Sequence, residues 1–458
     1  MAPAAGRPGE TRKDIGMMHP ENGSRSWMIL LLLLSAWLPA GAQQGASRRA
    51  EAPTVLVIGG GGRQEVRACP DDGVLAELIE SLSAGGGGRL VFSPGVVEFR
   101  RGINLAGIRK VELIGGPGTV FRFRDLEEWG RIRTTGSHAF SEKVVEVDRP
   151  DLVRANYRYQ LFLPDLKGGR FLECHVKKVK GNLLELAWSS VTQPGVESIE
   201  AGAYVVPEIN FFDSFRGGEI RFEGITFEGN VDISKVDLGG RPFYGHTTHC
   251  GIVIRNLYKA PRPRPATRGI QIERCTFRNL LGRGVAIYNV DGVRIRDCTF
   301  ESIRTEGLEI DHWSLGVVIS GCRFDRCGTG VQLNDCNEVA VTESFFMGNH
   351  LGLRVLDALH DRTTNHGLIV SDNVFRANNK GLLVDAAASG NSIRGNLFED
   401  CGSVAVTLRA DEVLFTGNLI RGSGQTGVEV FGKRCLIKDN LIVPPTSAGD
   451  GFQRIRNR

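Results

Sequence analysis

Hydrophobic and polar residues alternate in short runs that recur at a nearly constant interval through the second half of the chain. Eight runs, from IQIERCTF to CLIKDNLI, end at Phe277, Phe300, Phe324, Phe346, Phe375, Phe398, Ile420 and Ile442. Most units hold a second alternating run after a glycine, as in Gly307-Leu-Glu-Ile and Gly330-Val-Gln-Leu. Alternation with a period of two predicts β-strands, and a fixed interval predicts repeated structural units. We therefore expect an all-β, single-stranded parallel β-helix with one coil per repeat.

Equivalent residues of successive coils should stack about 4.8 Å apart. The position two residues before the end of each run is Asn373, Asn396, Asn418 and Asn440 in the later repeats, which predicts a hydrogen-bonded asparagine ladder. In the earlier repeats the same position is Cys275, Cys298 and Cys322. Side chains in register have parallel Cα–Cβ directions, so we expect buried thiols there rather than disulfides.

These repeats resemble the pectate-lyase-like superfamily of right-handed β-helix proteins, and within it the generic β-helix repeat group. The resemblance covers residues 218–443 and implies a right-handed coil. That superfamily includes lyases, hydrolases, epimerases and non-catalytic binders, so the resemblance predicts the fold and leaves the reaction open.

The N-terminal part is less regular and predicts a cap. Residues 72–82 place Val74, Leu75, Leu78, Ile79 and Leu82 on one helical face, and strand-like sequence follows a run of glycines. A β-helix needs a cap because an open end would expose apolar core and unpaired backbone groups. We predict a cap and first coils over 43–130, a small β-rich insertion over 131–207, β-helix repeats over 208–443 and a tail over 444–458.

Residues 1–42 are typical of a cleaved export signal. Arg25 precedes an apolar run from Trp27 to Leu38, and Ala40-Gly41-Ala42 is a small-residue cleavage site. The run is shorter than the ~20 residues of a membrane span. We expect a secreted or periplasmic protein with no stable membrane anchor after signal cleavage.

Composition and charge narrow the expected partners. The chain has 59 glycines in 458 residues, which suits a turn-rich β protein, and a formal net charge of +4. That charge is too small to indicate a nucleic-acid-binding protein. A polysaccharide is the partner that we expect.

The post-glycine strands should present a polar outer face in the middle of the repeats. Glu309, Gln332 and Arg354 are expected in one column of that face; Tyr288, Asp311 and Asn334 are expected in the other. His312 and Trp313 follow Asp311 directly. Directional hydrogen-bonding groups next to aromatic rings are what recognition of an oligosaccharide requires. We predict that Tyr288, Trp313, Gln332 and Asn334 bind substrate.

Two enzymatic interpretations of this face stay open. Glu309 and Asp311 should lie about 7 Å apart, near the spacing of the two carboxyl groups in inverting glycoside hydrolases. A lyase or epimerase instead needs a cation that neutralises a uronate carboxylate, for which Arg354 is a candidate. It also needs a base, for which His312, Tyr288 or Lys380 are candidates. A third interpretation is an ordinary solvent-exposed polar face.

Several other motifs are weaker. Tyr244 and His246 are expected to contact substrate from a groove wall. His246, His249 and Cys250 lack the spacing of a zinc site, so no metal ligands are predicted. The insertion 357–366 adds loop candidates, among them His366. Gly59–Gly62 do not fit a dinucleotide-binding loop, because Gln64 and Pro70 break the motif.

The sequence thus predicts an exported carbohydrate-active enzyme that acts on a polysaccharide, either by lyase or epimerase chemistry or as a glycoside hydrolase. Glu309, Asp311, His312 and Arg354 are the expected catalytic residues, and Lys380, Tyr244 and His246 complete the expected binding residues. The alternative is a non-catalytic saccharide-binding or surface-structural β-helix protein. No cofactor is identified, and a calcium requirement stays open.

Overall fold

The computed structural model describes residues 52–124, 132–155, 157–162, 171–188, 197–215, 217–231, 248–256, 268–356, 365–385, 388–424, 426–445 and 453–457. The export signal that the sequence predicts at 1–42 lies outside the described residues.

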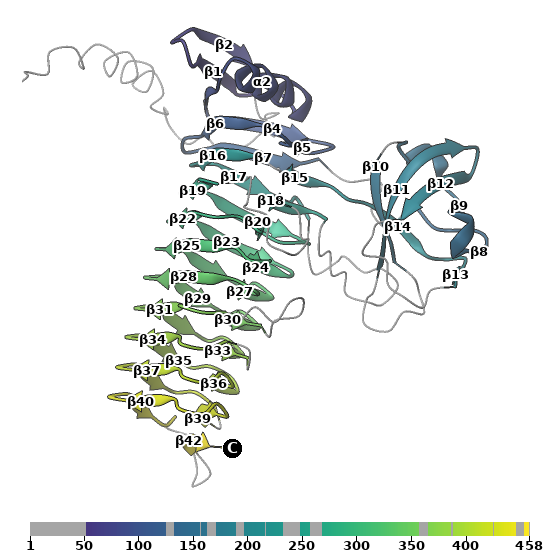
Figure 1. The fold of residues 1–458 in the computed structure, drawn as a ribbon. Coiled ribbons are helices and arrows are strands. Elements are labelled where there is room, and N and C mark those ends of the chain that lie inside the picture. The colour runs from purple at the N-terminus through teal and green to yellow at the C-terminus, as the bar shows by residue number, and fades with distance from the viewer. Residues whose placement is uncertain are drawn as a thin grey trace, which may run out of the picture. The chain divides into compact units, whose positions relative to one another are not determined.

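The described chain winds through three long sheets and confirms the predicted β-helix with one coil per repeat (Figure 1). Each regular coil contributes one strand to sheet 1, one to sheet 2 and one to sheet 3, and equivalent strands of successive coils pair in parallel.

Sheet 1 has 13 strands, in the order β2 (Gln64–Ala68), β1 (Thr54–Gly59), β3 (Gly88–Phe92), β6 (Arg109–Ile114), β16 (Gly218–Glu223), β19 (Gln271–Glu273), β22 (Arg294–Arg296), β25 (Leu315–Ser320), β28 (Asn337–Thr342), β31 (Ile369–Ser371), β34 (Ser392–Arg394), β37 (Leu414–Thr416) and β40 (Leu436–Lys438). Sheet 2 has 11 strands, in the order β4 (Gly95–Phe99), β7 (Thr119–Phe123), β17 (Thr226–Glu228), β20 (Thr276–Leu280), β23 (Thr299–Ile303), β26 (Arg323–Asp325), β29 (Phe345–Met347), β32 (Val374–Arg376), β35 (Leu397–Glu399), β38 (Leu419–Arg421) and β41 (Leu441–Val443). Sheet 3 also has 11 strands, in the order β5 (Ile103–Asn104), β15 (Asn210–Phe215), β18 (Cys250–Arg255), β21 (Val285–Tyr288), β24 (Glu306–Asp311), β27 (Thr329–Leu333), β30 (Leu351–Val355), β33 (Lys380–Val384), β36 (Val404–Leu408), β39 (Thr426–Val430) and β42 (Gln453–Asn457).

The predicted N-terminal cap is present. Helix α2 spans Asp72–Ala84 and begins where the Asp71 side chain accepts a hydrogen bond from the Val74 N–H. It buries Leu75, Leu78, Ile79 and Leu82 on one face. Strands β1 and β2 pair antiparallel beyond the first parallel strands. The apolar side of α2 therefore packs onto the core of the first coils.

The predicted insertion forms a separate small β unit. Its five-stranded sheet has the order β14 (Tyr204–Pro207), β10 (Tyr157–Phe162), β11 (Phe171–Lys180), β12 (Leu183–Trp188) and β9 (Val144–Glu146). Strands β13 (Ser198–Ile199) and β8 (His138–Ala139) pair beside it, and two short 3-10 helices span Phe140–Glu142 and Pro150–Leu152. The insertion has its own cluster of buried apolar side chains, so it folds around a second small core.

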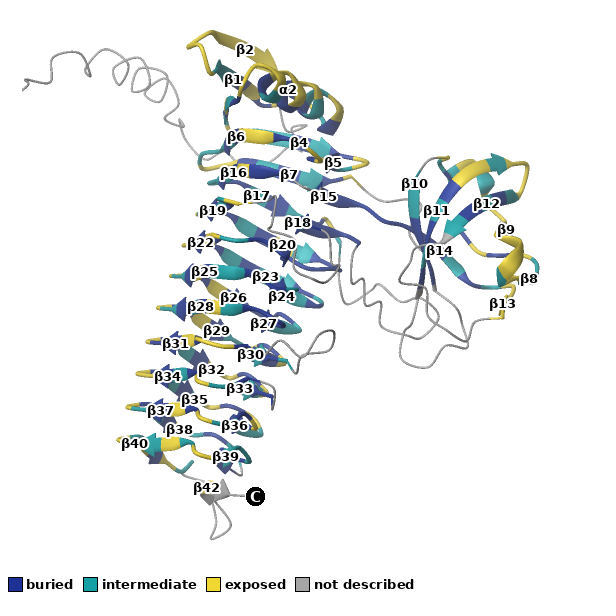
Figure 2. Cartoon of the chain, in the orientation of Figure 1, coloured by how far each residue is buried: buried dark blue, intermediate teal, exposed yellow. Residues whose placement is uncertain are grey.

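Stacked phenylalanines form the centre of the β-helix core. The rings of Phe277 and Phe300 stack with centroids 5.0 Å apart, and those of Phe324 and Phe346 with centroids 4.8 Å apart. Glycines near the start of the sheet 3 strands leave room for these rings. A Cβ at Gly330 would lie 2.7 Å from the Phe346 ring and 2.5 Å from a carbonyl of the next coil. Figure 2 shows buried positions alternating with more exposed ones along the strands.

The asparagine ladder forms as the sequence predicts. Asn373 donates to Asn396, Asn396 to Asn418 and Asn418 to Asn440, at 2.9–3.0 Å. A second ladder, which the sequence analysis missed, joins Asn349 to Asn378 at 2.9 Å. The stacked Cys275, Cys298 and Cys322 are buried thiols. Both ladders fix the turns between sheets, and so the register of the sheet 3 side chains.

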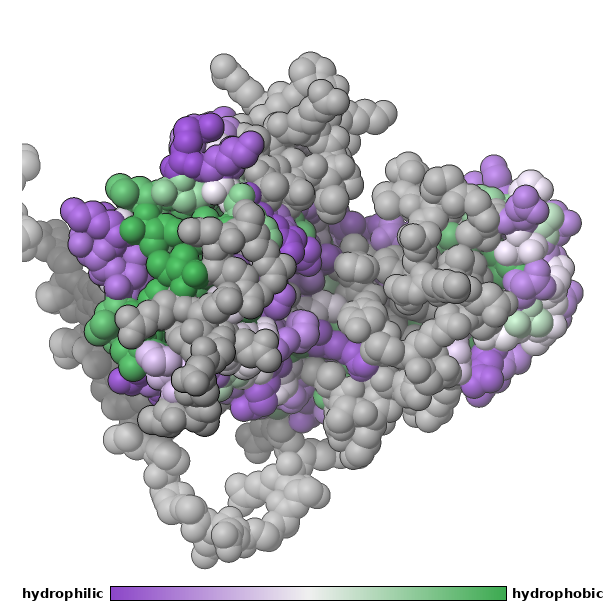
Figure 3. All heavy atoms as spheres, turned by 90° about the horizontal axis from the view of Figure 1, so that it is seen from below, coloured by the Kyte–Doolittle hydropathy of each residue, from purple (hydrophilic) through white to green (hydrophobic). Residues whose placement is uncertain are grey.

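Within the predicted tail over 444–458, strand β42 pairs in parallel with β39 and adds a further strand to sheet 3. Leu436, Leu441 and Val443 of the last coil are exposed. The view from below shows hydrophobic surface gathered at this end of the β-helix (Figure 3). Among the described residues, no helix is long and apolar enough to span a membrane.

Candidate functional site

The outer face of sheet 3 carries the predicted columns in register. Glu309 pairs with Gln332 on the next coil, and Gln332 pairs with Arg354. Tyr288 pairs with Asp311 in the second column. The columns follow from two-residue alternation, because Leu308 and Ile310 point into the core and leave Glu309 and Asp311 outside.

Glu309 lies at the centre of a buried hydrogen-bond network. Its carboxylate accepts from Arg283 Nη2 at 3.1 Å, from the Tyr288 hydroxyl at 2.5 Å and from Gln332 Nε2 at 2.9 Å. Arg283 also donates to the Tyr288 hydroxyl at 2.8 Å and to Glu306 at 3.0 Å. The network therefore holds the Tyr288 hydroxyl between a cation and a carboxylate.

Burial dominates the electrostatics of this network. Glu309 is 3 % exposed, and loss of solvent raises the pKa of its carboxyl group, although the Arg283 guanidinium works against that shift. The pKa of Arg283 is raised well above its usual value, because Glu309 and its other acidic neighbours outweigh the cost of burying the cation. We conclude that a buried Arg283 stays charged and that Glu309 serves it as a counter-ion.

Asp311 lies two residues further along the strand, beside His312. Burial and the nearby Glu309 carboxylate together raise the pKa of Asp311 to about 8. The His312 N–H donates to Asp311 Oδ1 at 2.6 Å, and the Asn334 side chain also hydrogen-bonds to Asp311. His312 and Trp313 both have a left-handed backbone, with φ of 49° and 61°, so the chain turns sharply there.

That turn brings side chains of adjacent coils close together. The His312 Nδ1 lies 3.6 Å from Asp311 Oδ1, and the His312 ring centroid lies 5.6 Å from that of Tyr288. A carboxylate oxygen of Asp335, on the next coil, lies within 4.8 Å of ligand atoms of both Asp311 and His312. Tyr288, Glu309, Asp311, His312, Gln332 and Asn334 are thus parts of one cluster, as the sequence predicts, with Trp313 directly beside it.

Two predicted residues lie on the same face but away from this cluster. Strand register places Arg354 three coils from Tyr288, about 14 Å along the sheet, and Lys380 one coil further. Arg354 lies 3.8 Å from Asp385, which also pairs with Arg409 at 3.1 Å. Arg354 and Lys380 are therefore too distant to act on the same sugar residue as Tyr288.

The loop candidates give a mixed outcome. Tyr244 and His246 lie outside the described residues, as does most of the insertion 357–366. His249 is buried and bonds the Gly229 carbonyl and the Leu281 N–H, each at 3.0 Å, and burial lowers its pKa to about 3. His366 bonds Ser389 at 3.0 Å on a different part of the coil. His249 is therefore a structural residue of the core.

A second acidic network adjoins the cluster on its N-terminal side. Arg255, the register partner of Tyr288, contacts Asp213 and lies 3.4 Å from Glu208. Glu208 is also 3.4 Å from Arg158. Both arginines pull the pKa of Glu208 down, but burial outweighs them and raises it to about 7. Much of the positive charge of Arg255 is therefore already balanced by acids.

Sequence reasoning missed Arg283, Glu306 and Asp335. The predicted columns contain only outward positions of the strands, and these three residues lie before or after those positions. Arg283 and Glu306 occupy equivalent positions on successive coils, directly before Gly284 and Gly307. The opposite charges of Arg283 and Glu306 at this repeated position could have predicted that the two side chains form an ion pair.

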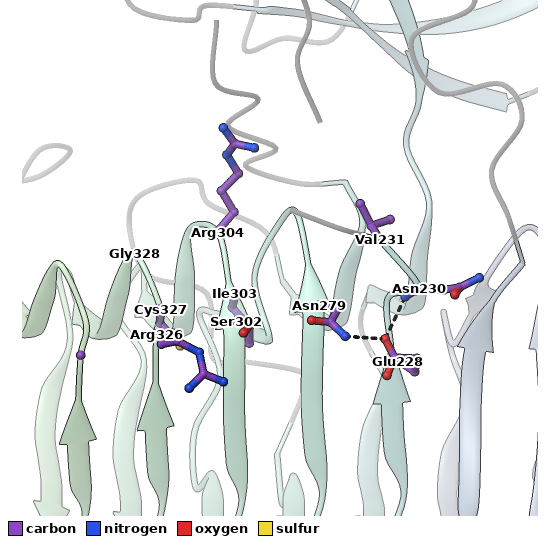
Figure 4. Close-up of a pocket in the computed structure, with 11 residues that line it drawn as sticks. Glu228, Asn230, Val231, Asn279, Ser302, Ile303, Arg304, Arg326, Cys327 and Gly328 are labelled. Atoms are coloured by element: carbon purple, nitrogen blue, oxygen red, sulfur yellow. Dashed lines mark hydrogen bonds between the residues drawn. The ribbon is translucent and has the colours of Figure 1, made fainter. Parts of the chain in front are cut away.

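A cavity of about 930 Å³ lies elsewhere, along the turns that follow sheet 2 (Figure 4). Glu228, Asn279, Ser302, Arg304 and Arg326 are among its lining residues. Glu228 accepts hydrogen bonds from Asn279 and Arg278, and Arg304 and Arg326 point in different directions in the close-up. This cavity does not gather the acid, base and cation that the sheet 3 cluster offers.

Comparison with known proteins settles the fold. Residues 218–398 match the family model "Right handed beta helix region". This protein is a right-handed β-helix protein. The match confirms the right-handed β-helix predicted from the repeats, and no curated protein matches the chain.

Solved structures that resemble this chain are distant from it in sequence. Bacteriophage phi29 gene product 12 aligns with a TM-score of 0.50 and 13% identity over 81% of this chain and 48% of its own. An exopolygalacturonase from Thermotoga maritima aligns with a TM-score of 0.45 and 12% identity over 85% and 87%. A mannuronan C-5 epimerase module from Azotobacter vinelandii aligns with a TM-score of 0.40 and 13% identity over 85% and 95%. At such identity the likeness concerns the fold alone.

Proposed function

We propose that this protein is a carbohydrate-active enzyme that transfers a proton at the carbon beside the carboxylate of an acidic polysaccharide, as lyases and C5 epimerases do. The observation that carries the proposal is the Tyr288 hydroxyl, held at 2.8 Å from Arg283 and 2.5 Å from Glu309 next to Asp311 and His312. A fixed phenol in a buried, charged setting suits proton transfer.

In the proposed reaction, the Tyr288 hydroxyl passes its proton to Glu309, to which it is hydrogen-bonded, and becomes a phenolate. The phenolate takes the C5 proton, and the C–H electron pair passes into the carboxylate as an enolate. In a lyase, the C4–O bond then breaks with its electron pair, a C4–C5 double bond forms, and the leaving oxygen takes the proton that Tyr288 has received. In an epimerase, C5 instead regains a proton from solvent water on the opposite face. Arg283 favours the phenolate, and Gln332 holds Glu309 in place.

Glycoside hydrolysis is the less favoured reaction for this geometry. The spacing of Glu309 and Asp311 along the strand suits a hydrolase, but such an enzyme needs one carboxylate to activate water and one carboxyl group to protonate the leaving oxygen. Glu309 is 3 % exposed and accepts from three side chains. It is therefore poorly placed to activate a water molecule.

Product analysis tests the proposal. The protein would be incubated with polygalacturonate, polymannuronate and a neutral β-glucan. New ultraviolet-absorbing ends, or solvent deuterium at C5, on an acidic polymer are the expected result. New reducing ends without that absorbance, or retention of a polymer without turnover, would contradict it and indicate a hydrolase or a binding protein.

A variant links the activity to the site. Tyr288→Phe should lower kcat by about 10²–10⁴-fold, because the proton carrier is lost while the ring stays. Tyr204→Phe, in the insertion sheet, is the matched control and should leave kcat unchanged. Full activity of Tyr288→Phe would remove the basis of the assignment.

We further propose that the protein is exported, with residues 1–42 as the cleaved leader. The support is the charged and apolar pattern of the sequence. Sequencing the N-terminus of the mature protein tests this, with a start at or near residue 43 expected and a retained leader as the contrary result.

A further inference from the structure

The sheet 3 cluster has its proton carrier, but among the described residues no cation is placed to neutralise a substrate carboxylate near Tyr288. Arg354 lies about 14 Å away by register. Arg255 already contacts Asp213 and Glu208, and Arg283 is occupied by Glu306 and Glu309. The side chains beside Tyr288 at the strand ends, Asp311 and His312, are instead of the kinds that bind metal ions.

We propose that Asp311, His312 and Asp335 bind a divalent metal ion of the manganese and zinc class, with Asn334 as a supporting oxygen ligand. A carboxylate oxygen of each aspartate and a ring nitrogen of His312 all lie within 4.8 Å of one another. In bound zinc sites, ligand atoms about 2.0–2.2 Å from the ion are separated from one another by roughly 3.0–3.5 Å. Small side-chain movements would close the site.

The fourth group is an independent observation. The Asn334 side chain hydrogen-bonds to the Asp311 carboxylate, so its amide lies within the cluster. Asn334 is 3 % exposed, yet its Oδ1 has no hydrogen-bond partner among the described residues. An unmet buried carbonyl oxygen is costly, and a metal ion would satisfy it.

The backbone holds these ligands on two adjacent coils. The Trp313 N–H donates to the Asp335 carbonyl at 2.6 Å, and the Asn334 N–H donates to the Ile310 carbonyl at 2.9 Å. Because both contacts are main-chain bonds, the relative position of the two strand ends does not depend on a bound ion. The site is therefore largely preformed.

The choice of ion follows from the donor set. Calcium and magnesium take oxygen ligands, whereas an imidazole nitrogen with carboxylates suits manganese, iron or zinc. The described residues of this site offer four protein groups, so coordination positions on the ion remain for a substrate. The role in the reaction rests on the proposed function: the ion would neutralise the uronate carboxylate while Tyr288 handles the proton. Metal binding itself does not rest on it.

Metal titration of the intact protein tests the site without substrate. After chelation and desalting, Mn²⁺, Zn²⁺ and Ca²⁺ would each be titrated by calorimetry, and bound Mn²⁺ counted by electron paramagnetic resonance. We expect one Mn²⁺ or Zn²⁺ per chain, bound more tightly than Ca²⁺. No binding, or preference for Ca²⁺, would overturn the proposal.

Matched variants locate the ion. His312→Gln and Asp335→Asn should each weaken Mn²⁺ binding at least tenfold. Asp385→Asn is the control, because Asp385 is an equally buried acid on the same sheet face, and it should bind as the unmodified protein does. Unchanged binding in His312→Gln would place the ion elsewhere and overturn the site.

Binding and turnover then separate the two proposals. A bound ion without turnover of any polysaccharide would sustain the metal site and refute the proposed reaction. Full turnover by chelated protein that binds no ion would sustain the reaction and refute the metal site.

Discussion

The outer face of sheet 3 has two regions, one on β21 and β24 and one around β30, β33 and β36, that differ in how far their charged groups are buried. Around Tyr288 and Asp311, the ionisable groups are buried and bonded to one another. Around Arg354 and Arg409, the cations are 37% and 51% exposed and share the carboxylate of Asp385. The β-helix supplies the same register to both, so burial distinguishes them. We infer that the first region performs chemistry and the second only attracts an acidic polymer.

The largest effect should come from opening the buried network. Arg283→Met leaves Glu306 and Glu309 buried without their cation, which should cost roughly 3–5 kcal/mol in the free energy of unfolding. Urea denaturation measures it. The double variant Arg283→Met/Glu309→Gln removes one stranded carboxylate and should recover part of the loss. Equal stability of both variants and the unmodified protein would show that the network is not buried as described.

A smaller effect on the free energy of unfolding, which depends on pH, should come from Glu208 at the edge of the buried region. Burial raises the pKa of Glu208 from its ordinary value of 4.5 to about 7. Between these values the folded protein holds a proton that the unfolded chain has released, so stability falls as pH rises through this window and is level above it. At about 1.4 kcal/mol per pKa unit, the effect is roughly 3–4 kcal/mol.

The variant Glu208→Gln isolates that contribution. Its free energy of unfolding should decline less between pH 5 and about 7.5 than that of the unmodified protein, because the titrating group is gone. Parallel pH curves for the two proteins would mean that Glu208 titrates normally in the folded state.

The smallest effect should come from the open region. Arg409→Ala removes an exposed cation that contacts one acid, so the free energy of unfolding should change by less than about 1 kcal/mol. For an acidic polymer, we expect KM to rise a few-fold, a weaker dependence of KM on salt and an unchanged kcat. A large fall in kcat would show that the region around Arg409 takes part in the chemistry, contrary to this assignment.

The sequence could predict what depends on periodicity. The intervals between Phe277, Phe300 and Phe324 define the coils, and two-residue alternation then places Glu309 beside Gln332 and Tyr288 beside Asp311. Counting the same coils would also have separated Arg354 from Tyr288. Arg283 and Asp335 were missed because they lie at the ends of the strands, outside the outward positions that alternation defines.

The sequence pattern also could not predict how deeply the outward side chains are buried. Glu309 is an outward position and was expected to face solvent as an acid or base, but it is 3 % exposed. Its environment depends on a guanidinium from the preceding turn and an amide from the next coil. Such a network is a tertiary property, since no single repeat contains it.

A structure of Tyr288→Phe with a bound oligouronate tests the central claim most directly. The account predicts a sugar residue whose C5 lies within about 4 Å of the ring edge at position 288, with its carboxylate directed at Asp311, His312 and Asp335. An oligosaccharide bound only along Arg354, Asp385 and Arg409, or in the cavity beside sheet 2, would contradict it.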